Sequence, residues 1–171
     1  MLCVVEKPDE RRLAAWRNLL ASHAALVDRL SEELQEEKGL PLPWYEVLLF
    51  LAQAPDGRLR MGELAGSLLL TPSGVTRLVD RMEGDGLVQR QQCPSDRRGW
   101  HAVITPAGRS RLRSAAPVHL RGVERHFGRH LSDDEADLVA DVLGRILGNL
   151  RPDSPLVERA CEPVSATAKT H

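Results

Sequence analysis

The sequence predicts a mainly α-helical fold with a small β-wing, and three observations in the chain of 171 residues lead to this prediction. Apolar residues recur at helical spacing over most of the chain. The stretch 87–104 instead has the short apolar runs and turn residues of a hairpin. Threonine-proline pairs at 71–72 and 105–106 mark helix starts, because a threonine hydroxyl caps free N–H groups and proline fits the first helical position. The length is that of one domain.

A helix-turn-helix is predicted within Leu59–Thr105, the stretch around which the chain is organised. A short helix covers Met61–Ser67, and a second helix begins at Pro72. One face of the second helix is apolar and consists of Val75, Leu78, Val79 and Met82. The other face is polar and carries Ser73, Thr76, Arg77, Asp80 and Arg81. Glycines at 84 and 86 end the helix, since glycine readily adopts the left-handed conformation of a C-cap.

A two-stranded wing is predicted after the second helix. Residues 87–91 and 101–104 are its strands, and a short strand at 58–59 lies beside them. Residues 93–100 are predicted as the turn between the strands, because proline, serine, aspartate and glycine are concentrated there. Arg97 and Arg98 stand at the tip of this turn, where guanidinium groups suit the negative potential of a DNA minor groove.

These residues resemble the winged helix-turn-helix of the multiple-antibiotic-resistance repressor (MarR) family. The resemblance rests on LTPSGVTRLVDRMEGDGLVQR at 70–90, CPSDRRG at 93–99 and ITPAG at 104–108, and it extends over about 9–150. It implies a sequence-specific DNA-binding transcription regulator, most often a dimeric repressor that a small organic effector releases from palindromic DNA. The DNA-binding residues expected are Thr71, Ser73, Thr76, Arg77, Arg81, Arg97 and Arg98.

Two aspartates near these positions are expected to act indirectly. Aspartate repels phosphate, so Asp80 is expected to orient an arginine rather than to contact DNA. Asp96 either does the same for Arg97 or Arg98 or is an ordinary turn residue.

The flanking helices are expected to form a dimer interface. One long helix is predicted over 9–37 and two more over 106–150, the last of which opens with the capping box Ser132–Glu135. Their apolar stripes exceed what the winged unit at 43–105, with its further helix at 44–54, can cover, so a second copy is the simplest partner. In such a dimer the recognition helices lie about 34 Å apart and read a palindrome. Residues 1–8 and 151–171 are expected to be flexible tails.

The charge distribution favours a nucleic-acid partner. The chain has a net charge of −1, yet residues 71–113 hold eight arginines against four acidic residues. Positive charge is therefore concentrated where the DNA-binding unit is predicted. A winged helix that binds a protein is the alternative, and the wing arginines argue against it. No glycine-rich phosphate loop, nucleophile elbow or HExxH motif occurs, so neither an enzyme nor a cofactor is expected.

Cysteine usage and hydropathy favour the cytoplasm. Three scattered cysteines argue against a disulfide framework. The sequence contains no run of about 20 apolar residues, so no membrane span is expected. The N-terminus lacks the basic and then apolar layout of a secretory signal. Cys3 and Cys93 are expected to be inert thiols rather than redox switches.

The histidines raise the question of a metal site. His126 and His130 stand at i, i+4, and His119 lies one heptad before His126. The neighbouring arginines disfavour a cation. We therefore expect exposed, unrelated histidines and no metal.

A small-molecule pocket is suggested by the resemblance, which places one between the dimer helices and the winged unit. The candidate residues are Trp16, His23, Trp44, Tyr45 and Arg90. Their rings could stack on and hydrogen-bond a small organic anion, with Arg90 or an arginine of the helix after the wing as counter-charge. The alternative is that they are core aromatics and one satisfied histidine, and the sequence does not separate the two.

Overall fold

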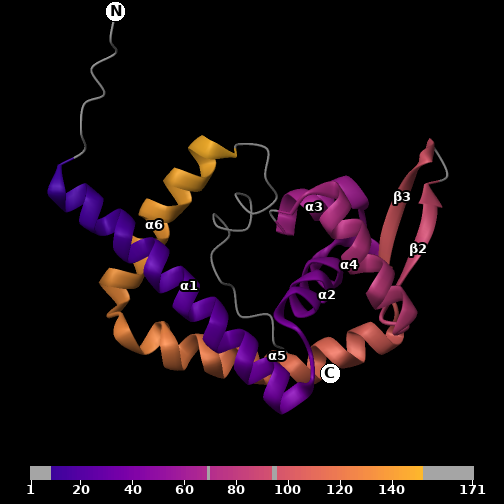
Figure 1. Ribbon diagram of the computed structural model, residues 1–171, viewed down its shortest axis with the longest axis horizontal. Helices are drawn as coiled ribbons and strands as arrows, with labels where there is room; N and C mark the ends of the chain where they lie inside the picture. The colour runs from indigo at the N-terminus through magenta and orange to yellow at the C-terminus, as the bar shows by residue number, and fades with distance from the viewer. Residues whose placement is uncertain (1–8, 69, 94–95, 152–171) are drawn as a thin grey trace, which may run out of the picture.

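The computed structural model describes residues 9–68, 70–93 and 96–151, except for the side chains of 96–98. Its helices and strands are α1 (Glu10–Lys38), α2 (Leu42–Gln53), β1 (Arg58–Arg60), α3 (Met61–Leu68), α4 (Pro72–Gly84), β2 (Val88–Cys93), β3 (Asp96–Ile104), α5 (Pro106–His126) and α6 (Asp133–Leu150). Figure 1 shows α2, α3, α4 and the strands gathered at one end, while α1 and α5 extend from them toward α6 at the other. The mainly helical fold with a small β-wing is confirmed.

The helix starts follow the capping residues of the sequence. The Thr71 hydroxyl accepts a hydrogen bond from the Gly74 N–H at 3.2 Å, and α4 begins at the next residue, a proline. The Thr105 hydroxyl accepts from the Gly108 N–H at 3.0 Å in the same way at the start of α5. Ser132 opens α6 with the predicted capping box. These local bonds satisfy N–H groups that no helix can satisfy internally.

The sheet has three antiparallel strands in the order β1-β3-β2. Arg58 pairs with Val103, which confirms the short strand beside the wing, and Val88 pairs with Ile104. The predicted turn over 93–100 is wrong in extent, because the ladder continues through β2 to Cys93 and through β3 from Asp96. A register shift between Gln92 and Cys93 lets the pairing continue. Turn-type residues therefore lie within paired strands here.

Two hydrophobic clusters hold the winged unit and join it to the long helices. The first contains the predicted inner face of α4, packed on α2, α3 and the sheet; its members include Val47, Leu48, Leu51, Leu64, Val75, Leu78, Val79, Met82, Val88, Ala102 and Ile104. The second joins α1, α2 and α5 through Leu34, Leu40, Leu42, Tyr45, Ala115 and Val118. Trp44 and Leu112 pack against both clusters. Helix α4 is thus connected to α1 and α5 through continuous packing.

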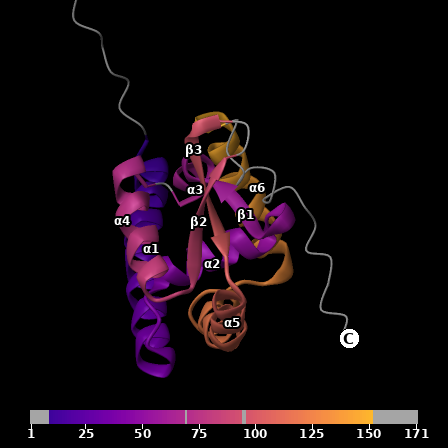
Figure 2. The same ribbon diagram turned by 90° about the vertical axis from the view of Figure 1, so that its right-hand side faces the viewer.

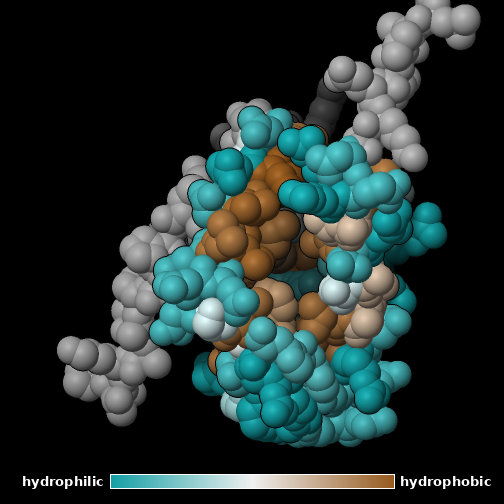
Figure 3. Space-filling model, turned by 90° about the vertical axis from the view of Figure 1, so that its left-hand side faces the viewer, coloured by the Kyte–Doolittle hydropathy of each residue, from teal (hydrophilic) through white to brown (hydrophobic). Residues whose placement is uncertain are grey.

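The outer helices leave apolar side chains uncovered. Helix α6 has no buried residue, although its apolar face includes Leu143 and Ile146. Trp16 of α1 is 55% exposed, and Leu20 and Phe127 are also exposed. Figure 3 shows apolar side chains surrounding a hollow on the side of the molecule that carries the first half of α1 and α6. Exposed apolar surfaces of this kind are typical of interaction sites.

The remaining boundaries differ little from those predicted. Helix α2 begins at Leu42 rather than at Trp44, with Pro43 in its first turn. Helix α5 runs through Pro117 to His126 and is followed by a short 3-10 turn at Gly128–His130. Among the helices of the described ranges, none has the length and apolar character that a membrane span needs.

Candidate DNA-binding surface and adjacent pocket

Helix α4 presents a polar face to solvent. Its apolar residues are buried, whereas Ser73, Thr76, Arg77, Asp80 and Arg81 are exposed. Figure 2 shows α4 standing beside the sheet rather than beneath it, so this face and the strands border the same side of the molecule. A helix set in this way beside a wing can enter a major groove.

The polar side chains of α4 differ in how far they are engaged. Thr71 uses its hydroxyl as the cap and lies 3.2 Å from the hydroxyl of Ser73. Thr76 donates to the Pro72 carbonyl at 2.9 Å, and Arg81 donates from Nε to the Arg77 carbonyl at 3.4 Å. In the described part of the chain Arg77 forms no ion pair. Its guanidinium therefore remains available for a phosphate or a base edge.

Arg90 of β2 is bound to α4. Its Nη1 lies 2.6 Å from Oδ1 of Asp80, and its Nε donates to Oε2 of Glu83 at 2.9 Å. The backbone N–H of Arg90 donates to Oε1 of Glu83 at 2.8 Å. The hydrogen bond from the Arg90 backbone is the largest cause that lowers the pKa of Glu83, and the Arg90 side chain lowers it further. Partial burial of Glu83 acts in the opposite direction and raises this pKa. Asp80 thus orients an arginine, as expected. The equivalent role of Glu83 is not predicted from the sequence.

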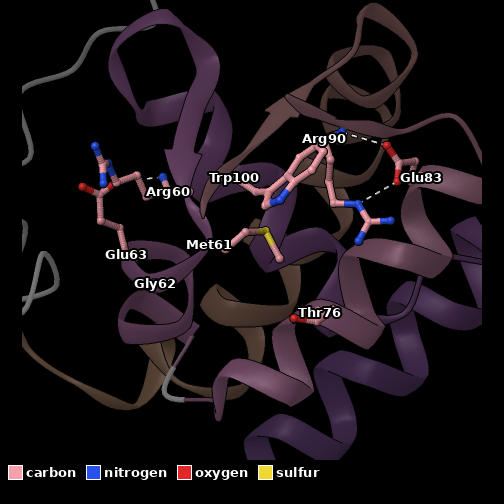
Figure 4. A pocket seen from close by; sticks show the side chains of 9 residues that line it. Arg60, Met61, Gly62, Glu63, Thr76, Glu83, Arg90 and Trp100 are labelled. Carbon is pink, nitrogen blue, oxygen red and sulfur yellow. Dashed lines mark hydrogen bonds and ion pairs between the residues drawn. The ribbon is translucent and has the colours of Figure 1, made fainter. Parts of the chain in front are cut away.

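A pocket of about 870 Å³ lies between α4, the start of α3 and the wing. It is lined by Met61 and Trp100, by Arg60 and Arg90, and by Thr76 of the α4 polar face. Figure 4 shows Trp100 between the two arginines, with Met61 below it in this view. Glu63 and Glu83 line it as well, so carboxylates balance the two arginines, and the apolar wall suits a flat organic molecule. No local pattern in the sequence places Arg60 or Trp100 there, because β-pairing across about 40 residues brings them together.

The two predicted wing arginines lie in β3, not in a turn. Arg97 and Arg98 follow Asp96, whose Cα pairs with that of Cys93. The side chains of these three residues lie outside the described part of the chain. Their proposed roles therefore rest on sequence position.

The predicted effector residues are not gathered at one place. Tyr45 is buried in the second cluster, and its ring centroid lies 4.5 Å from that of His119. Burial raises the pKa of Glu46, and His23 across from it on α1 partly offsets this rise. Trp16 is exposed, and Arg90 lines the separate pocket beside α4. For Tyr45, the alternative interpretation as a core aromatic residue therefore fits.

The histidines of α5 are not all exposed, contrary to expectation. His126 lies 2.8 Å from Oε1 of Glu33, and this hydrogen bond is the largest cause that lowers the pKa of Glu33. Burial lowers the pKa of His119, whose Nδ1 is buried and has no partner in the described part of the chain. Within the described ranges no three metal-binding side chains form a group.

The predicted tails and two of the cysteines fall at 1–8 and 152–171, outside the described residues. Cys93 is buried at the outer end of β2, where Arg60 donates to its sulfur at 3.5 Å. A buried thiol is poorly accessible to oxidants, which supports the expectation that it is inert.

Sequence comparisons agree with this geometry. A family model described as MarR family matches residues 38–99. The repressor YetL of Bacillus subtilis is 30% identical over 113 residues, which cover 66% of this chain and 67% of YetL. The regulator MhqR of the same organism is 26% identical over 137 residues, covering 80% of this chain and 92% of MhqR.

Solved structures give the same result. AbsC, a MarR family transcriptional regulator from Streptomyces coelicolor, is 33% identical with a TM-score of 0.79, covering 87% of this chain and 100% of AbsC. Sco3205, from the same organism and family, was solved in complex with DNA; it is 32% identical with a TM-score of 0.80, covering 87% of this chain and 97% of Sco3205. These relatives are regulators rather than enzymes.

Proposed function

We infer that this chain, which belongs to the MarR family of transcriptional regulators, represses transcription as a homodimer bound to palindromic DNA. The observation that carries the inference is the exposed polar face of α4, with Arg77 unpaired among the described residues and the wing beside it. YetL is a repressor, and Sco3205 was solved with DNA. The positive charge of residues 71–113 supports DNA over a protein partner at this surface.

Homodimerisation is supported by the uncovered apolar side chains of α1 and α6. A second copy that covers the hollow in Figure 3 would bury both sets at once. Two α4 helices would then be presented to successive major grooves, so that a two-fold operator matches a two-fold protein. In this arrangement Thr71, Ser73, Thr76 and Arg81 accompany Arg77 on the major-groove side, and Arg97 and Arg98 serve the wing.

Arg77→Ala is expected to weaken binding to the operator by about 1–3 kcal/mol and to relax sequence preference at one base pair, because a guanidinium binds guanine bidentately. The affinity is measured on a duplex selected by the parent protein and on single base-pair variants of it. Arg113→Ala is the matched control, because it removes one exposed arginine from α5. Equal losses for Arg77→Ala on selected and random DNA would reduce Arg77 to a phosphate contact.

We further propose that a small organic effector, anionic or aromatic, releases the protein from DNA. The pocket beside α4 supports this proposal, since Thr76 of the α4 polar face lines it together with Arg90 and Trp100. An occupant with different affinity for the DNA-bound and free arrangements would shift the population between them, and only by that difference. Trp16, His23 and Trp44 define the alternative place for the same effector, nearer the dimer helices.

The two places are separated by testing release with a panel of aromatic carboxylic acids. Trp100→Ala is expected to leave DNA affinity within about threefold and to raise the concentration needed for release about tenfold, since it removes an apolar wall. Trp16→Ala and His23→Ala are expected to release like the parent. The reverse pattern, with loss of response in the α1 variants alone, would move the effector to the dimer helices.

A further inference from the structure

Beyond the buried base of the wing, the link between α4 and β2 is polar. In the described part of the chain, the ion pairs that join these two elements both belong to Arg90, at 2.6 Å to Asp80 and 2.9 Å to Glu83. All three side chains are partly buried, being between 34% and 45% exposed. Glu83 also accepts the backbone N–H of Arg90, so the carboxylate holds the strand as well as the side chain.

Apolar packing holds β2 to α4 only at the base of the wing and not at the level of Arg90. Val88 at the base of β2 is buried, whereas the four residues after it are exposed. At the outer end, Cys93 is buried, and the Arg60 side chain of β1 donates to its sulfur at 3.5 Å. The core therefore fixes the base of the wing, and the Arg60 side chain contacts its outer end. Among the ion pairs of the described residues, those that join the middle of β2 to α4 are made by Arg90.

This attachment acts on the part of the wing proposed to reach DNA. From Arg90 to Cys93 the strand extends by about 10 Å. A rotation of the wing by about 10° at Arg90 would displace that end by nearly 2 Å. Arg97 and Arg98 lie on the paired strand beyond this point. Because hydrogen bonds to DNA need donor–acceptor distances near 2.9 Å, a displacement of this size removes them.

We propose that Asp80 and Glu83 are specificity-determining positioning residues: by binding Arg90 they set the angle between the recognition helix and the wing, without contacting DNA themselves. The inference rests on the proposed function, since it assumes that α4 and the wing read DNA together. It explains two carboxylates on a surface that otherwise gathers arginine. It also gives Arg90 a structural role, which is to hold β2 against α4.

The direction in which DNA affinity changes when Asp80 or Glu83 is neutralised distinguishes positioning from simple electrostatics. Removing an acidic group beside DNA weakens repulsion of phosphate, and electrostatics alone predicts tighter binding to every duplex. Loss of positioning predicts weaker binding, confined to duplexes whose flanks the wing reads. Asp85→Asn is the matched control: it removes one negative charge just after α4, from a side chain without an ion pair in the described ranges.

The test uses four duplexes built on a sequence that the parent protein selects from a random pool. The core is either the selected one or scrambled, and each core carries A·T-rich or G·C-rich flanks, which differ in minor-groove width. Asp80→Asn, Glu83→Gln and Arg90→Lys are each expected to lose about tenfold on the selected core with preferred flanks, the size of one lost base-pair preference. Their preference for the selected core over the scrambled core, and their melting temperatures, are expected to match the parent.

Several outcomes would overturn the proposal. One is that Asp80→Asn and Glu83→Gln bind all duplexes tighter, as Asp85→Asn should. Another is that Arg90→Lys alone weakens binding, which would make Arg90 a DNA contact. A lower melting temperature with equal losses of affinity on all duplexes would show that the substitution destabilises the whole fold. A parent protein without flank preference would show that the wing does not recognise the flanks. A parent without core preference, or Arg77→Ala without effect on it, would instead refute the proposed function.

Discussion

Gly108→Ala should destabilise the fold by about 3 kcal/mol, the upper part of the range for overpacking a core. Gly108 is buried in the first turn of α5, and a Cβ placed there would collide with the Leu87 carbonyl oxygen. It would also stand 3.0 Å from side-chain atoms of Ile104 and Leu48. Thr105 donates to the same carbonyl from its backbone N–H at 3.1 Å and from its hydroxyl at 3.0 Å. The carbonyl cannot move aside without breaking the start of α5.

The matched control for Gly108→Ala is Gly66→Ala, the same change within α3. Apart from its chain neighbours and the backbone of its own helix, no atom lies within 4 Å of the position of its added Cβ. Alanine favours helix over glycine, so Gly66→Ala should raise stability by up to about 1 kcal/mol. Urea unfolding of both variants measures the difference. A Gly108→Ala variant as stable as the parent would mean that α5 can shift away from β2, and that the winged unit is less rigidly joined to the long helices.

The elements whose signals are local could be predicted closely. Thr71, Thr105 and Ser132 each mark the start of a helix within a single turn of the chain. The apolar face of α4 follows from its spacing, and all its members are buried. These features depend on side chains that act within four residues of their own position, and such interactions are visible in the sequence.

The rest depends on pairing between distant residues. The wing strands are longer than predicted because backbone pairing and the burial of Cys93 outweigh the turn preference of the residues after it. Glu83 was overlooked because its role appears only when β2 folds back along α4. The resemblance implies one pocket for the candidate aromatic residues, yet Tyr45 packs in a core with His119 while Trp16 stays exposed.

Ile146→Asp should convert the protein from a dimer to a monomer. Ile146 is 47% exposed on α6, a helix in which no residue is buried by its own chain. If a second copy covers this face, the substitution places an unpaired carboxylate in an apolar interface at about 3–5 kcal/mol. A two-fold interface contains the substitution twice, so the total cost is about 6–10 kcal/mol. A micromolar dimer is held by only about 8 kcal/mol.

Sedimentation at micromolar concentration measures the change: the parent should have twice the chain mass of 18.9 kDa, and Ile146→Asp should have the mass of one chain. Asp137→Asn is the control, because it changes the charge of the same helix by one unit at an exposed position on the face opposite to Ile146. It should leave the dimer intact. DNA binding by Ile146→Asp should fall to that of a single recognition helix, with no preference for a palindrome over one half-site. A parent that sediments as a monomer, or an Ile146→Asp variant that remains dimeric, would show that another surface joins the two recognition helices or that one copy binds alone.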